Sequence, residues 1–86
     1  MITSAQMRAA RALLGIDQKT LAELSGLSVP TIQRMESGTG TVRGVVDSLT
    51  KVVEAFERSG IELIGEGAQS TGGGRGVRLK SPAYKP

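Results

Sequence analysis

The segment QKTLAELSGLSVPTIQRMESG, residues 18–38, holds two short stretches of helix-forming sequence on either side of a Ser-Gly-Leu-Ser turn. Asp17 is a good N-cap for the first stretch, and Gly26 ends its apolar pattern. Ser28 caps the second stretch, and Pro30 stands in its first turn, where a missing backbone N–H does no harm. Two short helices in this arrangement cross steeply, so the pattern predicts a helix-turn-helix.

The flanking sequence predicts two further helices. Ser4 is a good N-cap ahead of a broad apolar face, and Gly15 is a natural stop. After a Gly-Thr-rich segment, apolar residues recur at spacings of three and four until Gly60. The predicted helices span about residues 4–14, 18–25, 29–36 and 45–58.

The last 26 residues change character. Residues 61–64 (IELI) and 77–80 (VRLK) alternate as strands do. Each strand places two apolar residues on one face, namely Ile61 and Leu63 in the first and Val77 and Leu79 in the second. The predicted fold is mainly α, with a four-helix domain over residues 1–60 followed by a short strand pair within an extension over residues 61–86.

The two predicted strands have two ways to pair. Within one chain, the glycine-rich loop of 12 residues between them is far longer than a usual hairpin connection. Pairing across a two-fold axis removes that difficulty, and the four apolar strand residues would then hold a dimer together. The alternative is a disordered tail, with dimerisation through helix 45–58 alone.

Composition excludes several classes of function. The 86 residues include no Cys and no His, which removes thiol chemistry, His-based catalysis and almost every transition-metal site. The glycine-rich segment contains no phosphate-binding loop pattern. We expect no enzyme, no cofactor and no metal. No segment has the ~20 apolar residues that span a bilayer, so we expect no membrane partner and a cytoplasmic, nucleoid-associated protein.

Charge is unevenly distributed along the chain. The formal net charge is +3, with +2 over residues 1–43, −3 over 44–66 and +4 over 67–86. This asymmetry permits binding to a polyanion without requiring it.

The predicted helix 29–36 has five outward residues: Val29, Pro30, Thr31, Gln33 and Arg34. Such a helix end suits a major groove, and the alternative is that these side chains only face solvent.

Together, these residues resemble the Cro and phage-repressor type of helix-turn-helix regulators, the XRE-like family. The resemblance runs from about Arg8 to Gly60, through RALLGIDQKTLAELSGLSVPTIQRMESG. The residues in register with the family pattern are Gln18, Leu21, Ala22, Gly26, Ser28, Ile32, Glu36 and Gly38. The resemblance implies a homodimer that binds double-stranded DNA at a partly palindromic operator. Where relatives have a fifth helix, this chain has strand-like sequence.

The resemblance also implies roles for individual residues. The base-reading positions are Val29, Pro30, Thr31 and Arg34. The first two cannot hydrogen-bond bases but could pack on thymine methyl groups. Arg34 is then the best candidate for a bidentate contact to guanine, with a phosphate contact as its alternative.

Further roles concern the DNA backbone and the fold. Gln18 matches a position that bonds a phosphate, and Ser28 matches a cap that also reaches the backbone. Because backbone contacts need only donors at the rim of the site, further candidates are Arg8, Lys19, Gln33, Thr39, Thr41 and Arg43, and the alternative for each is a side chain that only faces solvent. Arg11 and Glu36 match an ion pair that ties the first helix to the end of the third.

Two functions fit this reading. The first is a transcriptional regulator, most simply a repressor. The second is an antitoxin or adaptor that binds a toxin or other protein and uses DNA binding to regulate its own operon. A neighbouring toxin gene would favour the second function.

Overall fold

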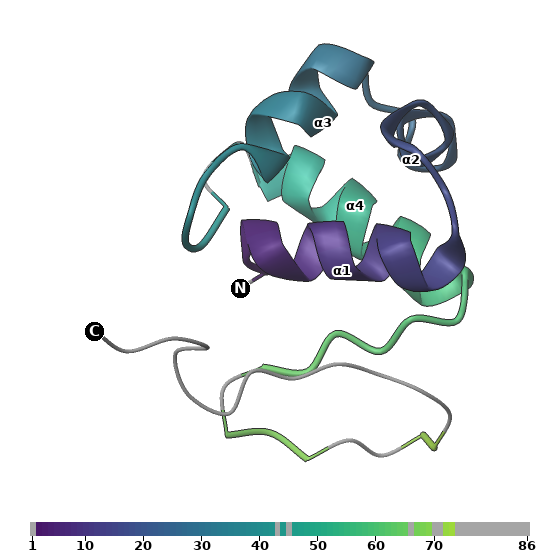
Figure 1. Ribbon diagram of the computed structural model, residues 1–86, viewed down its shortest axis with the longest axis vertical. Helices are drawn as coiled ribbons and strands as arrows, with labels where there is room; N and C mark the ends of the chain where they lie inside the picture. Colours follow the sequence, from purple (N-terminus) through teal and green to yellow (C-terminus); the bar gives the residue numbers. More distant parts are fainter. Residues whose placement is uncertain (1, 43, 45, 66, 70–71, 74–86) are drawn as a thin grey trace.

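The computed structural model describes residues 2–42, 44, 46–65, 67–69, 72 and 73. Within these described residues the four helices are α1 (Ser4–Leu14), α2 (Gln18–Ser25), α3 (Val29–Glu36) and α4 (Val46–Arg58). Helix α2 packs against α3 and α4, and α1 packs against α3 (Figure 1). The predicted helices are therefore confirmed. Val45, the predicted start of the last helix, lies outside the described residues.

The N-cap of helix α1 is Thr3, one residue before the predicted cap Ser4. The Thr3 hydroxyl accepts a hydrogen bond from the Gln6 backbone N–H, and the Gln6 side-chain oxygen accepts one from the Thr3 N–H. This reciprocal pair is a capping box. The prediction of Ser4 as the cap is wrong because Ser4 is buried inside the first turn. Its hydroxyl donates instead to the Met35 carbonyl on α3, at 2.7 Å.

The caps of the next two helices agree with the sequence. The Asp17 carboxylate accepts a hydrogen bond from the Thr20 N–H at 2.8 Å, and the Ser28 hydroxyl accepts one from the Thr31 N–H at 3.3 Å. Each side chain satisfies one of the donors that the first turn of a helix leaves unpaired. These local signals fix where α2 and α3 begin.

The helices end in two different ways. Helices α1, α2 and α4 are each followed by a glycine in the left-handed region: Gly15, Gly26 and Gly60, with φ of 69°, 74° and 93°. In each case the next N–H bonds back five residues, which is the Schellman arrangement. Helix α3 is followed by Ser37 in a right-handed conformation, with φ of −80°. Its end therefore needs other partners for its carbonyls.

All four helices contribute to one apolar core. Its largest fully buried apolar side chains come from α1 (Met7), α2 (Leu21), α3 (Ile32) and α4 (Val52 and Phe56). Each such side chain contributes about 1.5–3 kcal/mol when it is removed from water. The short helices α2 and α3 would be marginal alone, so this shared core sets their positions.

The connection from α3 to α4 is held by the N-terminal residues. Thr3 and Thr41 form an isolated antiparallel β-bridge. The Val42 N–H donates to the Ile2 carbonyl at 2.9 Å, and the Ser4 N–H donates to the Gly40 carbonyl at 3.0 Å. The loop that follows α3 therefore runs beside the start of α1 (Figure 1).

The prediction of a strand at residues 61–64 is wrong. The described part of the chain contains no strand beyond the single bridge, and residues 61–64 form an irregular segment running past α1 (Figure 1). Ile61 and Leu63 are half-buried against the helical core, and the Ile64 carbonyl accepts a hydrogen bond from the Gln6 side chain at 3.0 Å. The alternation therefore reflects one-sided burial on helices, which needs no partner strand.

The second half of the predicted strand pair, 77–80 with Val77 and Leu79, lies outside the described residues. The architecture that the structure shows is thus mainly helical, with a helix-turn-helix at α2 and α3. Within the described ranges, no helix combines the length and the apolar character needed to cross a bilayer.

Candidate DNA-binding site

Helix α3 has two sharply different sides. Ile32, Met35 and Glu36 are buried, while Pro30, Gln33 and Arg34 are exposed. The exposed residues stand three and four positions apart, so they share one face of the helix. This outer face is open to solvent along the whole length of α3.

The predicted base-reading residues divide between these sides. Pro30 and Arg34 lie on the outer face. Val29 is half-buried and packs against the core, so only part of its side chain is accessible. Thr31 is also half-buried, and its hydroxyl lies 2.8 Å from that of Ser28. Gln33, predicted only as a backbone contact, is exposed on the same face as Arg34.

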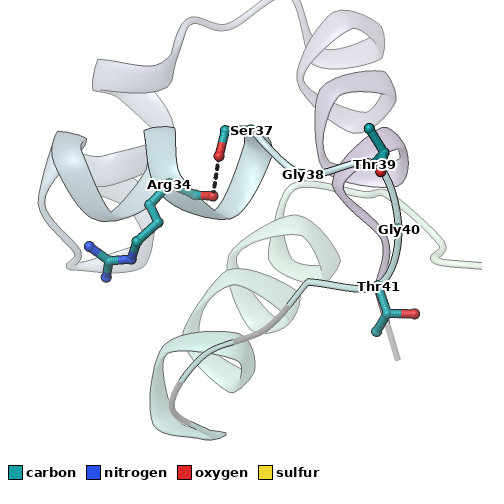
Figure 2. Close-up of a pocket in the computed structure, with 6 residues that line it drawn as sticks. All are labelled: Arg34, Ser37, Gly38, Thr39, Gly40 and Thr41. Atoms are coloured by element: carbon teal, nitrogen blue, oxygen red, sulfur yellow. Dashed lines mark hydrogen bonds between the residues drawn. The ribbon is translucent and has the colours of Figure 1, made fainter.

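Arg34 borders a shallow depression at the end of α3. Figure 2 shows the residues that line it: Arg34, Ser37, Gly38, Thr39, Gly40 and Thr41. The Ser37 hydroxyl donates to the Arg34 carbonyl at 2.8 Å, while the Arg34 guanidinium extends away from the loop. Among the described residues the guanidinium has no hydrogen-bonding or ionic partner. Its donors are therefore available to a ligand.

The inner side of α3 is anchored by Glu36. Two nitrogens of Arg11 donate to its two carboxylate oxygens, at 2.7 and 2.8 Å. The Gln18 side-chain nitrogen donates to one of these oxygens at 3.1 Å. The Glu36 side chain is only 3% exposed and that of Arg11 is 21% exposed. The structure thus brings Arg11 and Glu36 together as a bidentate pair that joins α1 to α3.

This environment shifts the ionisation of both partners. Burial by itself raises the pKa of Glu36, but the hydrogen bonds from Arg11 and Gln18 and the charges of Arg11 and Arg8 outweigh it, so the pKa is lowered. The hydrogen bond to Glu36 raises the pKa of Arg11 despite its partial burial. Both groups are therefore charged at neutral pH.

The predicted backbone contacts lie on several elements around α3. Gln18 is the first residue of α2, and its bond to Glu36 uses one of its two amide hydrogens, which leaves the other without a partner among the described residues. Lys19, Thr39 and Thr41 are exposed. Arg43 lies outside the described residues.

Arg8 differs from the other predicted backbone contacts. One of its terminal nitrogens, Nη1, donates to the Glu36 main-chain carbonyl at the end of α3. The same nitrogen lies 3.5 Å from the Gly38 carbonyl. Arg8 is thus engaged with main-chain atoms of its own chain.

Two features of this site were missed from the sequence. Gln33 was predicted to face outward, but only as a backbone contact, and its spacing from Pro30 could have made it a base-reading candidate as well. No local signal points to Ser4, whose hydroxyl reaches 31 residues along the chain to α3. Tertiary hydrogen bonds of this kind are invisible to periodicity.

The arrangement is suited to reading DNA. A short helix is fixed by its buried side, and its opposite side presents a cationic and an amide side chain with free donors. Helix-turn-helix proteins place such a recognition helix in the major groove while neighbouring elements contact phosphates. The chemistry available here is hydrogen bonding and apolar contact.

Comparison with known proteins agrees with this geometry. Residues 7–45, which include α2, α3 and most of α1, match the family model described as Helix-turn-helix. No curated protein matches the sequence. The matched model is the Cro/C1-type, XRE-like helix-turn-helix domain, which supports a DNA-binding transcription regulator.

Proposed function

We propose that the chain is a sequence-specific repressor that binds a partly palindromic operator as a homodimer, with α3 in the major groove. The observation that carries this proposal is the outer face of α3, where Gln33 and Arg34 are exposed and have no partners among the described residues. Free donors on a rigid helix are what base-edge recognition requires. The proposed role is binding, without catalysis, in the cytoplasm.

Three side chains of the outer face divide the reading between them. Arg34 donates two hydrogen bonds to the O6 and N7 atoms of a guanine, and Gln33 pairs with the N6 and N7 atoms of an adenine. Pro30 offers an apolar contact to a thymine methyl group, aided by the accessible part of Val29. Each bidentate contact discriminates against a wrong base by about 1–3 kcal/mol.

Residues around α3 hold the DNA backbone. Gln18 donates its remaining amide hydrogen to a phosphate while its other hydrogen stays on Glu36. The other proposed phosphate contacts are Lys19, Ser28, Thr39, Thr41 and Arg43. These contacts set the register of α3 on the duplex and carry no sequence information.

The dimer contact is proposed on α4. Ile61 and Leu63 already pack against the core of their own chain, so they are less available to a partner. Val46, at the start of α4, is 72% exposed, the most exposed of the large apolar residues that the structure describes. A two-fold axis near α4 would have to place two α3 helices one DNA turn apart, about 34 Å.

Selection of bound duplexes from a random pool tests this function. The expected result is a two-fold symmetric site whose half-sites are about 10 base pairs apart. Enrichment of one unsymmetrical half-site would refute the homodimer on a palindrome. Absence of any enriched sequence would refute sequence-specific binding itself.

A matched pair of variants strengthens the selection. Arg34→Ala should lose the base preference at the position that Arg34 reads, and with it part of its preference for the selected site over random DNA. Lys51→Ala removes an exposed cation from α4 and should leave the selected site unchanged. If both variants select the wild-type site, Arg34 does not read it.

A further inference from the structure

Helix α3 lacks the local device that ends the other three helices. No left-handed glycine follows it, since Ser37 is right-handed. Instead its last two carbonyls are satisfied from α1: the Ser4 hydroxyl donates to the Met35 carbonyl, and Arg8 donates to the Glu36 carbonyl. The end of α3 is therefore held by side chains of another helix.

Arg8 suits this task for two physical reasons. The last four carbonyls of a helix have no partner within the helix, and a cation beside them also interacts favourably with the helix dipole. The guanidinium is planar and keeps its charge, so it can hold a fixed position between α1 and the end of α3. Its Nη1 atom also lies 3.5 Å from the Gly38 carbonyl, the first glycine of the following loop.

The close packing at this point leaves little room for movement. A Cβ atom added to Gly38 would lie 3.3 Å from the Ser4 hydroxyl oxygen. Two residues further along the loop, the Gly40 carbonyl accepts a hydrogen bond from the Ser4 N–H. Ser4 and Arg8, one helical turn apart on α1, thus hold the chain from Met35 to Gly40.

We propose that Arg8 is a positioning residue for DNA recognition: by holding the end of α3 and the Gly38 carbonyl against α1, it sets the direction in which the outer face of α3 points, and it does not bind a phosphate. This inference rests on the proposed DNA-binding function. It replaces the phosphate contact expected from the sequence for this arginine.

The salt dependence of binding separates the two roles. Each phosphate that a cation neutralises adds about 0.9 to the slope of log affinity against log salt. The experiment titrates the full-length chain with the selected duplex at several salt concentrations, using Arg8→Met and Arg8→Lys. The matched control is Arg58→Met, because Arg58 also donates to a backbone carbonyl, that of Leu24 at the end of α2, and its loss changes the net charge equally.

A positioning role predicts weaker binding with an unchanged slope. We expect Arg8→Met to lower affinity for the selected duplex by about tenfold, the loss of one charge-assisted hydrogen bond. Arg8→Lys keeps the charge but not the planar fork, so it should also bind more weakly than wild type at the wild-type slope. Binding to random duplexes should fall less, and Arg58→Met should bind as wild type does.

Two outcomes would overturn the proposal. A slope reduced in magnitude by about 1.8 in Arg8→Met, which is about 0.9 for each of the two Arg8 side chains in the dimer, with wild-type affinity in Arg8→Lys, would identify a phosphate contact. Wild-type affinity and specificity in Arg8→Met would show that Arg8 has no role in recognition.

Hydrogen exchange without DNA tests the anchoring separately. The Ser37 N–H bonds to the Arg34 carbonyl at the end of α3, and its exchange should accelerate by about tenfold in Arg8→Met. The Ile61 N–H, bonded at the end of α4, should exchange at the wild-type rate. If the wild type binds no duplex, the proposed function fails, and hydrogen exchange alone decides whether Arg8 anchors the end of α3. Unchanged exchange at Ser37 in Arg8→Met would overturn the anchoring role of Arg8.

Discussion

The two sides of α3 differ in how many partners their side chains have. On the inner side, Ile32 is fully buried and Glu36 accepts hydrogen bonds from Arg11 and Gln18. On the outer side, Gln33 and Arg34 have none within the described residues. The helix therefore separates the residues that fix its position from those that face a ligand. Substitutions on the two sides should change different measurable quantities.

The largest expected effect is that of Ile32→Ala on stability. Ile32 is fully buried, so removing its side chain leaves a cavity and should lower the free energy of unfolding by about 2–5 kcal/mol. Gln33→Ala, the next residue along α3, should change it by less than about 0.5 kcal/mol. Urea unfolding of both variants measures the contrast. Similar losses in the two would contradict the division of α3 into two sides.

Glu36→Gln should have the second-largest effect on stability, because it leaves Arg11 without its ionic partner. The pair is largely buried, so the expected loss of unfolding free energy is about 2–4 kcal/mol, between the values for exposed and fully buried pairs. A double-mutant cycle with Arg11→Met isolates the coupling. Additive losses in the cycle would show that the two side chains do not stabilise one another.

Arg34→Ala should affect recognition and leave stability nearly unchanged. Loss of a bidentate base contact is expected to weaken binding to the selected operator by about 1–3 kcal/mol, with a smaller effect on random DNA. The melting temperature should stay near that of wild type because the guanidinium has no partner within the described residues. Equal losses on operator and random DNA would mean that Arg34 contacts phosphate only.

The smallest effect is expected in acid, from the lowered pKa of Glu36. The folded state holds this carboxyl below its ordinary pKa of 4.5, so its contribution to stability is complete above that value and is lost as the pH falls towards the lowered pKa. Unfolding measured between about pH 3 and pH 7 should show a smaller acid loss in Glu36→Gln than in wild type.

The contribution of Asp17 to stability depends on pH in the same way in wild type and in Glu36→Gln, since hydrogen bonds from the Thr20 backbone and hydroxyl lower the pKa of Asp17 in both. The comparison of wild type with Glu36→Gln therefore isolates Glu36. If the two proteins lost stability equally in acid, the charge of Glu36 would not contribute.

The helices and their caps were largely predictable because their signals are local. Asp17, Gly26 and Ser28 fix the ends of α2 and α3 within a few residues of sequence. The cap of α1 could also be predicted, since Thr3 and Gln6 have the spacing of a capping box. The prediction of Ser4 as the cap did not take that spacing into account.

Other parts of the structure depend on contacts that no short pattern contains. The alternation at 61–64 correctly indicated burial of Ile61 and Leu63, but it could not say whether a strand or a helix covers them. Likewise, the sequence does not show whether a charged side chain such as Arg8 contacts a phosphate or a main-chain carbonyl on a neighbouring helix. The α-helical register alone placed Gln33, while the interaction of Arg8 required the packing of α1 on α3.

The β-bridge between Thr3 and Thr41 has a practical consequence for labelling the protein. It places the first described residues beside the loop after α3, whereas the segment 61–65 runs along the far side of α1 from α3 (Figure 1). In the proposed complex, a fluorophore at residue 40 of this loop would therefore sit close to a bound duplex and report its arrival, because the position is exposed and an added Cβ there would meet no atom within 4 Å. A fluorophore at residue 65, which is exposed and equally unobstructed, would be distant from the duplex and would serve as the internal reference.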